Sequence, residues 1–462
     1  MSRQGRSSGP AALGPVELER LAGLQQFIGA DRLQQVLHDT GRRNRSHCRL
    51  THAVMLWVVL AMGILTDLPL REVFRCASRR QPGRKLPGRA GLCRARRRLG
   101  VAPVRRLFHQ VARPLACPAR PGGFYGGLRL VGIDGTVLDV PDSPANARAF
   151  GRPQGGRGDG AFPQVRKLSL VELGTHAELA LVLKPCATSE QAMFGGLVRH
   201  LQPGMLLLCD QNFFSFDRWC QLSNRGVALL WRVQSQMVLV PEQALADGSY
   251  LARVYPSPKH RLRGQGGVVV RVLRYTLDDP QRVGHGQVHT LLTTLRDAAA
   301  HPATTLILLY HERWEQELVL DEQKTHQAPR QAGKEAQLRS ETPAGVVQEV
   351  YALALGHYVT RALMAEAAAA ARLDPDRLSF VSCLRILRLR LPECTRLCWA
   401  EFRRWYRELL AEMAEERLPP RRNRINPRVV KRKLSKFPKK RAEHRPVPPL
   451  KKKFVEAIVI ET

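Results

Sequence analysis

The sequence predicts an α/β protein in which a mixed sheet with helices on its faces lies between a helical N-terminal region and a helical, basic C-terminal region. Three observations support this class. Apolar residues follow helical spacing through residue 115, strand-like and helix-like segments alternate from Leu128 to Val233, and residues 234–295 are rich in strand-like runs. The 462 residues correspond to two to four domains at roughly 150 residues per domain.

The N-terminal region, residues 1–118, is predicted to be a helical DNA-binding domain. The expected helices are Val16–Ile28, Asp31–Asp39, a helix capped by Thr51 that runs through Leu65, Leu70–Ala77, Ala90–Leu99 and Val104–Ala112. Arg96, Arg97 and Arg98 give the fifth of these a basic character that suits insertion into a DNA groove, although a solvated helix face is the alternative. The Pro/Gly-rich stretch CPARPGGFYGG separates this region from the next.

The middle region, residues 124–372, is predicted to hold the mixed sheet, with the β-rich stretch 234–295 as an insertion. The expected strands are Leu128–Val140, Lys167–Leu173, Ala180–Lys184, Met205–Asp210 and Val227–Val233, and the expected helices are Ser189–Leu201, Phe216–Ser223, Thr304–Lys324 and Gly345–Arg372. Thr342-Pro343 marks the start of the last helix. Residues 373–462 are expected to form a helical region with a basic tail.

The formal net charge of +33 is concentrated at two places along the chain. Residues 42–106 contain 17 Lys/Arg and 2 acids, and residues 417–453 contain 16 Lys/Arg and 1 acid. Two basic arms around a nearly neutral centre are typical of a protein that grips a polyanion, chiefly DNA, and does its chemistry in the middle. A disordered basic tail is the alternative for the second arm, since seven prolines break any long helix there.

Several classes of protein are disfavoured. The N-terminus lacks the apolar segment of a secretory signal, and the longest apolar run, Ala53–Leu65, is shorter than the about 20 residues of a membrane span. The ten cysteines form no CxxC pair, which disfavours a structural zinc site and favours a reducing compartment. We therefore expect a cytoplasmic, nucleoid-associated protein with no membrane contact.

Three carboxylates stand at positions that suit a metal site. Asp134 lies among apolar strand residues, Asp210 ends the strand MLLLCD, and Glu317 lies on the helix LYHERWEQELVLDEQK. Carboxylates without His or Cys at ligand spacing suit two Mg²⁺ or Mn²⁺ ions, which promote attack on phosphodiesters. Alternatively, Asp134 occupies a turn, Asp210 caps a loop and Glu317 pairs with Arg313. Other candidates are Asp139, Asp142, Asp159, Glu315 and Asp321.

Four different side chains share one face of the predicted helix that carries Glu317. Tyr310, Arg313, Glu317 and Lys324 occur at offsets that fall within about 60° of one another on an ideal helix. Arg313 and Lys324 beside a metal-binding Glu317 would hold phosphates near the cleavage point. The alternative is an exposed stripe of salt bridges.

These segments resemble a known family. YHERWEQELVLDEQK fits the Y-x2-R-x3-E-x6-K motif of the DDE transposases of the insertion-sequence-four family, bacterial cut-and-paste elements. LVGIDGTVLDVPDSPAN resembles the family's first-Asp segment and LLLCDQNFFSFDRW its second. TGRRNRSHCRLTHAVMLWVVLAM with RRRLGVAPVRRLF is similar to its N-terminal domain, so the resemblance covers most of the chain.

The resemblance implies a ribonuclease-H-like core with catalytic Asp134, Asp210 and Glu317, and DNA contacts from Tyr310, Arg313 and Lys324. It implies metal-dependent cleavage at the transposon's terminal inverted repeats, a possible hairpin step, transfer of the 3′-OH to target DNA, and a dimer on paired ends.

Two departures stand out: Gln211 follows the second Asp where the family often has Arg, and no Trp lies between Trp231 and Trp314 to clamp a flipped base. The competing hypotheses are a metal-dependent nuclease without strand transfer and a catalytically idle DNA-binding derivative.

Overall fold

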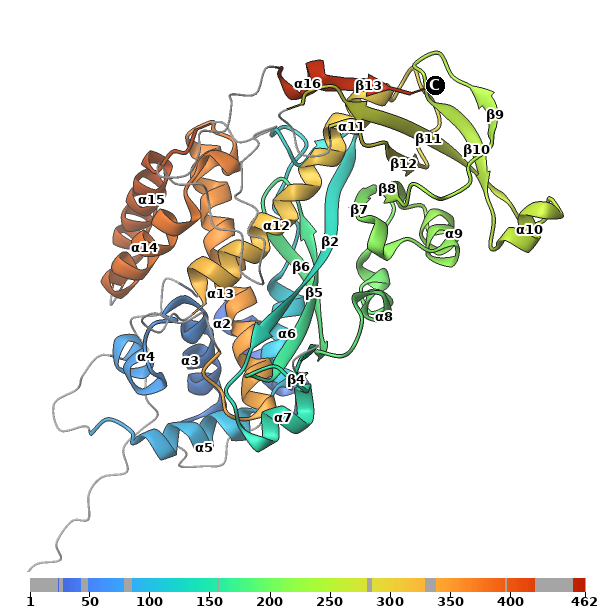
Figure 1. Cartoon of the computed structure of the whole chain (residues 1–462). Coiled ribbons are helices and arrows are strands. Elements are labelled where there is room, and N and C mark those ends of the chain that lie inside the picture. The colour runs from blue at the N-terminus through green and yellow to red at the C-terminus, as the bar shows by residue number, and fades with distance from the viewer. Residues whose placement is uncertain are drawn as a thin grey trace, which may run out of the picture.

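The computed structural model describes Leu24 and residues 28–42, 49–78, 85–155, 158–280, 285–328, 338–394, 397–419 and 452–461. The predicted α/β class is confirmed, because a large mixed sheet passes between two sets of helices (Figure 1). Most of the basic tail and parts of the first basic arm, at 43–48 and 79–84, lie outside the described residues. None of the described helices is long and apolar enough to cross a membrane.

Within the described residues, five short helices precede the sheet. They are α2 (Ala30–Asp39), α3 (His52–Ile64), α4 (Leu70–Ala77), α5 (Arg89–Leu99) and α6 (Ala102–Val111). Thr51 caps α3 as predicted, with its hydroxyl accepting from the Val54 N–H at 3.2 Å. The apolar run forms a buried helix, since every residue from Val54 to Ile64 is buried. A Cβ at Gly63 would lie 1.8 Å from the Ala352 carbonyl oxygen, so this glycine lets α3 touch α13 (Pro343–Ala370).

The first half of the sheet contains the predicted strands in the predicted order. They are β2 (Leu128–Asp139), β5 (Gln164–Glu172), β6 (Ala177–Pro185), β7 (Met205–Cys209) and β8 (Ala228–Val233), with the short β1 (Phe124–Tyr125) beside β2. Their spatial order is β6-β5-β2-β7-β8. The first three are antiparallel neighbours, whereas β7 runs parallel to both β2 and β8. The core thus consists of three antiparallel strands, followed by β7 and β8, which run parallel to β2.

Helices and connections surround this core. They are α7 (Pro144–Phe150), β3 (Gln154–Gly155), β4 (Gly158–Asp159), α8 (Glu190–Phe194), η2 (Val198–His200), η3 (Gln211–Phe213) and α9 (Phe216–Asn224). The predicted helix over residues 189–201 is wrong in length: α8 ends at Phe194, and the single 3₁₀ turn η2 follows. Gly195 and Gly196 come directly after α8, and glycine is unfavourable in a continuing helix.

Residues 234–295 are rich in strands, as predicted, and these strands extend the same sheet. The elements of this segment are β9 (Pro241–Ala244), β10 (Tyr250–Val254), α10 (Pro258–Leu262), β11 (Val268–Leu277) and β12 (His289–Thr293). β12 pairs antiparallel with β8, which continues the sheet through β11 and β10 to β9. The C-terminus returns here as α16 (Phe454–Ala457) and β13 (Ile458–Ile460), and β13 adds to β11, a pairing that the sequence analysis did not predict.

The prediction of one regular α-helix over residues 304–324 is wrong. This stretch is built of α11 (Ala303–Tyr310), the 3₁₀ turn η4 (His311–Arg313), α12 (Trp314–Asp321) and the π-helical turn η5 (Glu322–Gln327). The remaining elements are α13, η6 (Pro375–Arg377), α14 (Phe380–Arg390), η7 (Leu391–Cys394) and α15 (Trp399–Glu415). Thr342 caps α13 as predicted.

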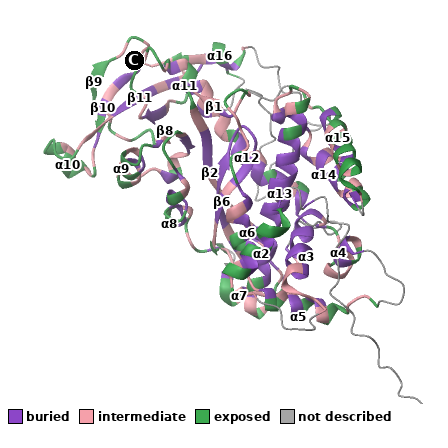
Figure 2. Cartoon of the chain, turned by 180° about the vertical axis from the view of Figure 1, so that it is seen from behind, coloured by how far each residue is buried: buried purple, intermediate pink, exposed green. Residues whose placement is uncertain are grey.

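The core has several layers. One apolar cluster joins α8 and α9 to one face of the sheet, and another joins α11 to the opposite face. The largest joins α2–α6 to α13, α14 and α15. Figure 2 shows α13 as the most continuously buried helix, lying between the sheet and the N-terminal helices. The helical regions at the two ends of the chain thus share one core.

Candidate active site

Asp134 and Asp210 lie level with each other on neighbouring parallel strands. The register of β2 and β7 pairs Gly132 with Leu208, and each aspartate follows its partner by two residues. Parallel neighbours are about 4.8 Å apart in a sheet, so the two carboxylates leave adjacent points of the sheet edge. Asp210 follows the last residue of β7, where the parallel pairing of the two strands has ended.

Local hydrogen bonds orient both aspartates. The Asp134 carboxylate accepts from the Gly135 N–H at 2.8 Å, and the Asp210 carboxylate accepts from the Gln211 N–H at 2.7 Å. The indole N–H of Trp231 donates to the Asp210 carbonyl oxygen at 2.9 Å. Asp210 therefore does cap η3, as the alternative interpretation proposed, and a capping role leaves the second carboxylate oxygen able to bind a further group.

Helix α12 carries Glu317 to the same sheet edge. A Cβ at Gly132 would lie 3.1 Å from the Gln316 side-chain oxygen, so the missing side chain on β2 lets α12 lie close to the strand. Glu317 accepts from Arg313 at 3.3 Å. The predicted pairing of these two residues is confirmed, and it holds the carboxylate and the guanidinium together beside β2.

Arg313 is the charge that the three carboxylates share. Burial disfavours the charged guanidinium, yet the pKa of Arg313 is raised overall because Tyr310, Asp210, Glu317 and Asp134 act on it. Its side chain is only 11% exposed. Asp134, Asp210 and Glu317 thus all act on one buried cation, but their carboxylate oxygens do not all lie within 4.8 Å of one another.

The carboxyl of Asp134 is the most perturbed acid of this group. Its pKa is raised to about 6; burial is the largest cause, and the neighbouring Glu190 and Glu317 act in the same direction. The Gly135 N–H and Arg313 lower it in part. An acid in such surroundings is stabilised as an anion by any added cation, which suits a metal ligand.

Tyr310 and Lys324 bind backbone carbonyls of the two aspartate-bearing strands. The Tyr310 hydroxyl donates to the Cys209 carbonyl at 3.2 Å, and its pKa is raised, chiefly by burial. The Lys324 ammonium donates to the Val137 carbonyl at 3.0 Å. Because the helix contains a 3₁₀ turn and a π turn, the ideal-helix argument for one regular stripe is wrong. Contacts to β7 and β2 place the two side chains instead.

Glu190 is a neighbour of the site that the sequence analysis missed. It is the first residue of α8, and its carboxylate pairs with Arg166 at 3.1 Å. A Cβ at Gly135 would lie 2.4 Å from a Glu190 carboxylate oxygen, so Gly135 makes room for this acid beside Asp134. A glutamate in the first turn of a helix is common because it interacts favourably with the helix dipole. The sequence therefore did not indicate that Glu190 lies beside the site.

The three consecutive arginines of α5, residues 96–98, are placed differently from one another. Arg97 and Arg98 are exposed. The Arg96 guanidinium instead donates to Gln348 at 2.9 Å, to Ser340 at 3.0 Å and to the Gly345 carbonyl at 2.7 Å. The expectation that all three share one DNA-facing surface is therefore corrected for Arg96, which fastens α5 to the start of α13.

The other candidate acids have other partners. Asp139 accepts from Gln164 at 2.8 Å, Asp142 pairs with Arg152, and Asp321 lies 3.5 Å from His326. Glu315 contacts His176 in a separate buried cluster. The side chain of Asp159 lies outside the described residues.

Comparison with known proteins finds transposases. The sequence model described as "Insertion element 4 transposase N-terminal" matches residues 18–109. "Transposase InsG for insertion sequence element IS4" of Escherichia coli (strain K12) is 29% identical over 438 residues, covering 90% of this chain and 93% of the relative. The chain is thus similar to IS4 transposases along most of its length.

Other similar proteins carry related names. "Putative transposase InsZ" of the same organism is 26% identical over 247 residues, covering 53% of this chain and 81% of the relative. Among solved structures, a piggyBac transposase synaptic complex with hairpin DNA matches with a TM-score of 0.42 and 10% identity, over 86% of this chain and 85% of that one. That last likeness is too distant to bear on the chemistry of this chain.

Proposed function

We propose that the protein is a DNA transposase in which Asp134, Asp210 and Glu317 hold two Mg²⁺ or Mn²⁺ ions for cleavage at transposon ends and transfer of the 3′-OH to target DNA. The observation that carries the proposal is the register that sets Asp134 level with Asp210, beside the helix that carries Glu317 and its partner Arg313. Similarity to an IS4 transposase along 90% of the chain supports it.

The donor set fits hard divalent cations. The three proposed ligands are carboxylates, and Mg²⁺ binds through oxygen. The raised pKa of Asp134, due chiefly to burial, indicates a carboxyl that needs a positive neighbour to stay ionised near neutral pH. When bound, such a pair of ions activates the attacking oxygen and stabilises the leaving oxygen of a phosphodiester.

The chain's own cations would hold the DNA backbone at this site. Arg313 lies among the three carboxylates, and a guanidinium there can bind a non-bridging phosphate oxygen while pairing with Glu317. Lys324 lies beside β2 at Val137, three residues beyond Asp134. Tyr310 is a positioning residue in this account, because its hydroxyl holds the carbonyl of Cys209, the residue before Asp210.

The order of the strands supports a ribonuclease-H-like core, which we propose for residues 124–372 with the insertion at about 234–295. Three antiparallel strands are followed by two strands parallel to the first, in the spatial order third, second, first, fourth, fifth. The proposed carboxylates come from the first strand, from the end of the fourth, and from the helix that follows the insertion.

We further propose that residues 1–118 read the transposon's terminal inverted repeats and that residues 373–462 add sequence-independent affinity. The exposed Arg97 and Arg98 on α5 support the first part, and the 16 Lys/Arg of residues 417–453 support the second. A dimer on paired transposon ends belongs to the same proposal.

The test is cleavage of DNA that carries the element's own terminal inverted repeats, with Mg²⁺ as the varied component. We expect strand cleavage that requires the metal and is abolished in Asp210→Ala while binding to the ends persists. Full cleavage by Asp210→Ala would remove this residue from the mechanism. Binding without cleavage by the wild-type protein would favour the idle derivative.

A further inference from the structure

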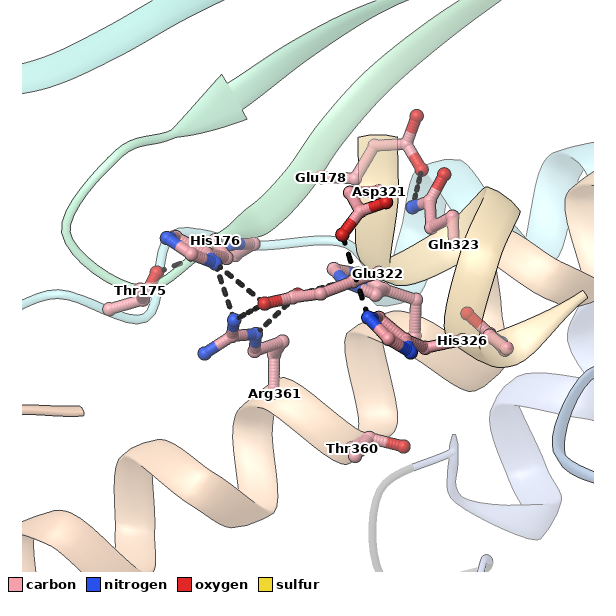
Figure 3. A network of polar contacts seen from close by, with 12 residues as sticks. Thr175, His176, Glu178, Asp321, Glu322, Gln323, His326, Thr360 and Arg361 are labelled. Atoms are coloured by element: carbon pink, nitrogen blue, oxygen red, sulfur yellow. Dashed lines mark hydrogen bonds and ion pairs between the residues drawn. The ribbon is translucent and has the colours of Figure 1, made fainter. Parts of the chain in front are cut away.

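A second cluster of side chains that can bind a metal lies on α12 and the elements next to it. The proposed reaction does not use these residues. His176 stands in the turn between β5 and β6 and is completely buried. Its φ of 60° lies in the left-handed region, which a residue other than glycine adopts only when its surroundings enforce it. The fold therefore holds this imidazole in one particular position (Figure 3).

Two carboxylates from distant parts of the chain meet one nitrogen of this ring. The Nε2 atom of His176 lies 2.7 Å from a Glu315 carboxylate oxygen and 3.6 Å from an Asp376 carboxylate oxygen. One ligand atom from each of the three residues lies within 4.8 Å of the other two, and all three residues are buried. Zn²⁺ binds nitrogen and oxygen at about 2.0–2.2 Å, so ligand atoms around it are roughly 3–3.5 Å apart, close to the observed separations.

The other nitrogen of the ring faces a supporting network. The Nδ1 atom lies 3.2 Å from a Glu322 carboxylate oxygen, and the Arg361 guanidinium contacts both Nδ1 and Glu322. Glu322 also contacts His357 at 2.9 Å. Figure 3 shows His176, Glu322 and Arg361 converging from the β5–β6 turn, η5 and α13. The Arg361 guanidinium can only donate, so a proton on Nδ1 requires that Arg361 pairs with Glu322 alone. With Nδ1–H donating to Glu322, the lone pair of Nε2 is left for a metal, which is the usual support of a metal-binding histidine.

We propose that His176, Glu315 and Asp376 form a structural binding site for a divalent transition-metal ion such as Zn²⁺. An imidazole with two carboxylates suits Zn²⁺ better than Mg²⁺, which prefers oxygen ligands throughout. Three side chains provide at least three bonds, and a carboxylate binding through both oxygens completes four-coordination. The carboxylates Glu315, Glu322 and Asp376 give the cluster an excess of acids that a divalent cation offsets.

The consequence of such a site is mechanical. The ion would tie the β5–β6 turn and η6 to α12, the helix on which Glu317 lies two residues after Glu315. It would therefore fix the helix that presents the third carboxylate, without touching DNA itself. The site itself stands apart from the proposed function, because metal binding by His176 does not require transposition.

The experiment removes the other expected metal ligands first. The full chain carrying Asp134→Asn, Asp210→Asn and Glu317→Gln is stripped with chelator and titrated with Zn²⁺ by calorimetry, and with Co²⁺ by visible absorption. We expect one ion per chain, the d–d absorption of a low-coordinate Co²⁺ site, and a melting temperature that rises with Zn²⁺. Zn²⁺ binding is measured here without DNA cleavage. The proposed metal site and the proposed transposase function can therefore fail independently of each other.

Matched variants then identify the ligands in that background. His176→Asn or Asp376→Asn should weaken Zn²⁺ binding at least tenfold, whereas His326→Gln, which alters a half-exposed histidine beside Asp321, should leave it unchanged. Absence of stoichiometric Zn²⁺ binding and of any effect of Zn²⁺ on melting before these changes would overturn the proposal, and the cluster would then be an ion-pair network alone. Binding that survives both ligand substitutions would also overturn it.

Discussion

Replacing Asp134 by the isosteric Asn should stabilise the metal-free protein at neutral and alkaline pH. The pKa of the Asp134 carboxyl is about 6 in the folded protein, chiefly because of burial, against an ordinary value of 3.8. A pKa difference of one between the folded and unfolded states corresponds to about 1.4 kcal/mol, so ionised Asp134 costs the folded state about 3 kcal/mol above pH 6. Asn keeps the size of the side chain and an oxygen that can accept from the Gly135 N–H.

The sign of this effect fixes its pH dependence. A carboxyl whose pKa is raised by folding costs nothing below its unfolded pKa of 3.8; its cost develops as the pH rises from there to about 6 and is constant above that. The gain from Asp134→Asn should therefore be present at pH 8 and mostly lost at pH 4.5. Added Mg²⁺ should reduce the gain at pH 8, because the wild-type protein alone retains all three carboxylates.

The assay is thermal or denaturant unfolding of both proteins in chelator at the two pH values. Because a chain of this size need not unfold in one step, the comparison is the difference between variant and wild type at each pH. Asp217→Asn, which removes one negative charge from an exposed position of α9, serves as a control for a general charge effect. A variant equally or less stable than wild type at pH 8 would refute the electrostatic account of Asp134.

Three further outcomes follow from the contacts of charged side chains. Lys324→Ala should cost about 1.5–3 kcal/mol of transition-state stabilisation, roughly ten- to a hundredfold in cleavage rate, and unchanged cleavage by the folded variant would exclude a phosphate contact. The double variant Arg97→Ala/Arg98→Ala should weaken binding to the terminal repeats at an unchanged melting temperature. Arg96→Ala should instead lower the melting temperature, because it breaks three hydrogen bonds to the start of α13. Neutralising the Lys/Arg of residues 421–451 should make the slope of log DNA affinity against log salt concentration shallower by about 0.9 per lost phosphate contact. An unchanged slope would contradict this prediction.

The location of the acidic residues was predictable because it depends on local pattern. Asp134 interrupts an apolar strand and Asp210 ends one, and the alternation of the flanking residues fixes both strands. A right-handed parallel connection between such strands places their ends at a common edge. The observed register of Gly132 with Leu208 agrees with that reasoning.

The shape of the Glu317 helix was not predictable in the same way, because distant contacts determine it. Tyr310 reaches Cys209, and Lys324 reaches Val137, each more than a hundred residues away. Gln323, on the π turn, donates to Glu178 inside the sheet. Helical periodicity specifies a helix over this stretch, but it contains no information on which turn tightens or widens to satisfy these partners.

The role of Arg96 shows the same limit. Its sequence neighbours are basic, which indicated a DNA-facing helix, yet its partner Gln348 is 252 residues away. Glu190 and β13 were missed for a related reason, since a glutamate at a helix start and a three-residue strand look ordinary until the sheet brings them beside Asp134 and β11.

Strand transfer is the measurement that tests the central claim most directly. Pre-cleaved transposon ends with free 3′-OH groups are incubated with target DNA, Mg²⁺ and either the wild-type protein or Glu317→Gln. We predict covalent joining of the 3′ ends to the target by the wild-type protein, and joining reduced at least a hundredfold by Glu317→Gln with end binding retained. Metal-dependent cleavage by the wild-type protein without any joined product would contradict the claim and identify a nuclease instead.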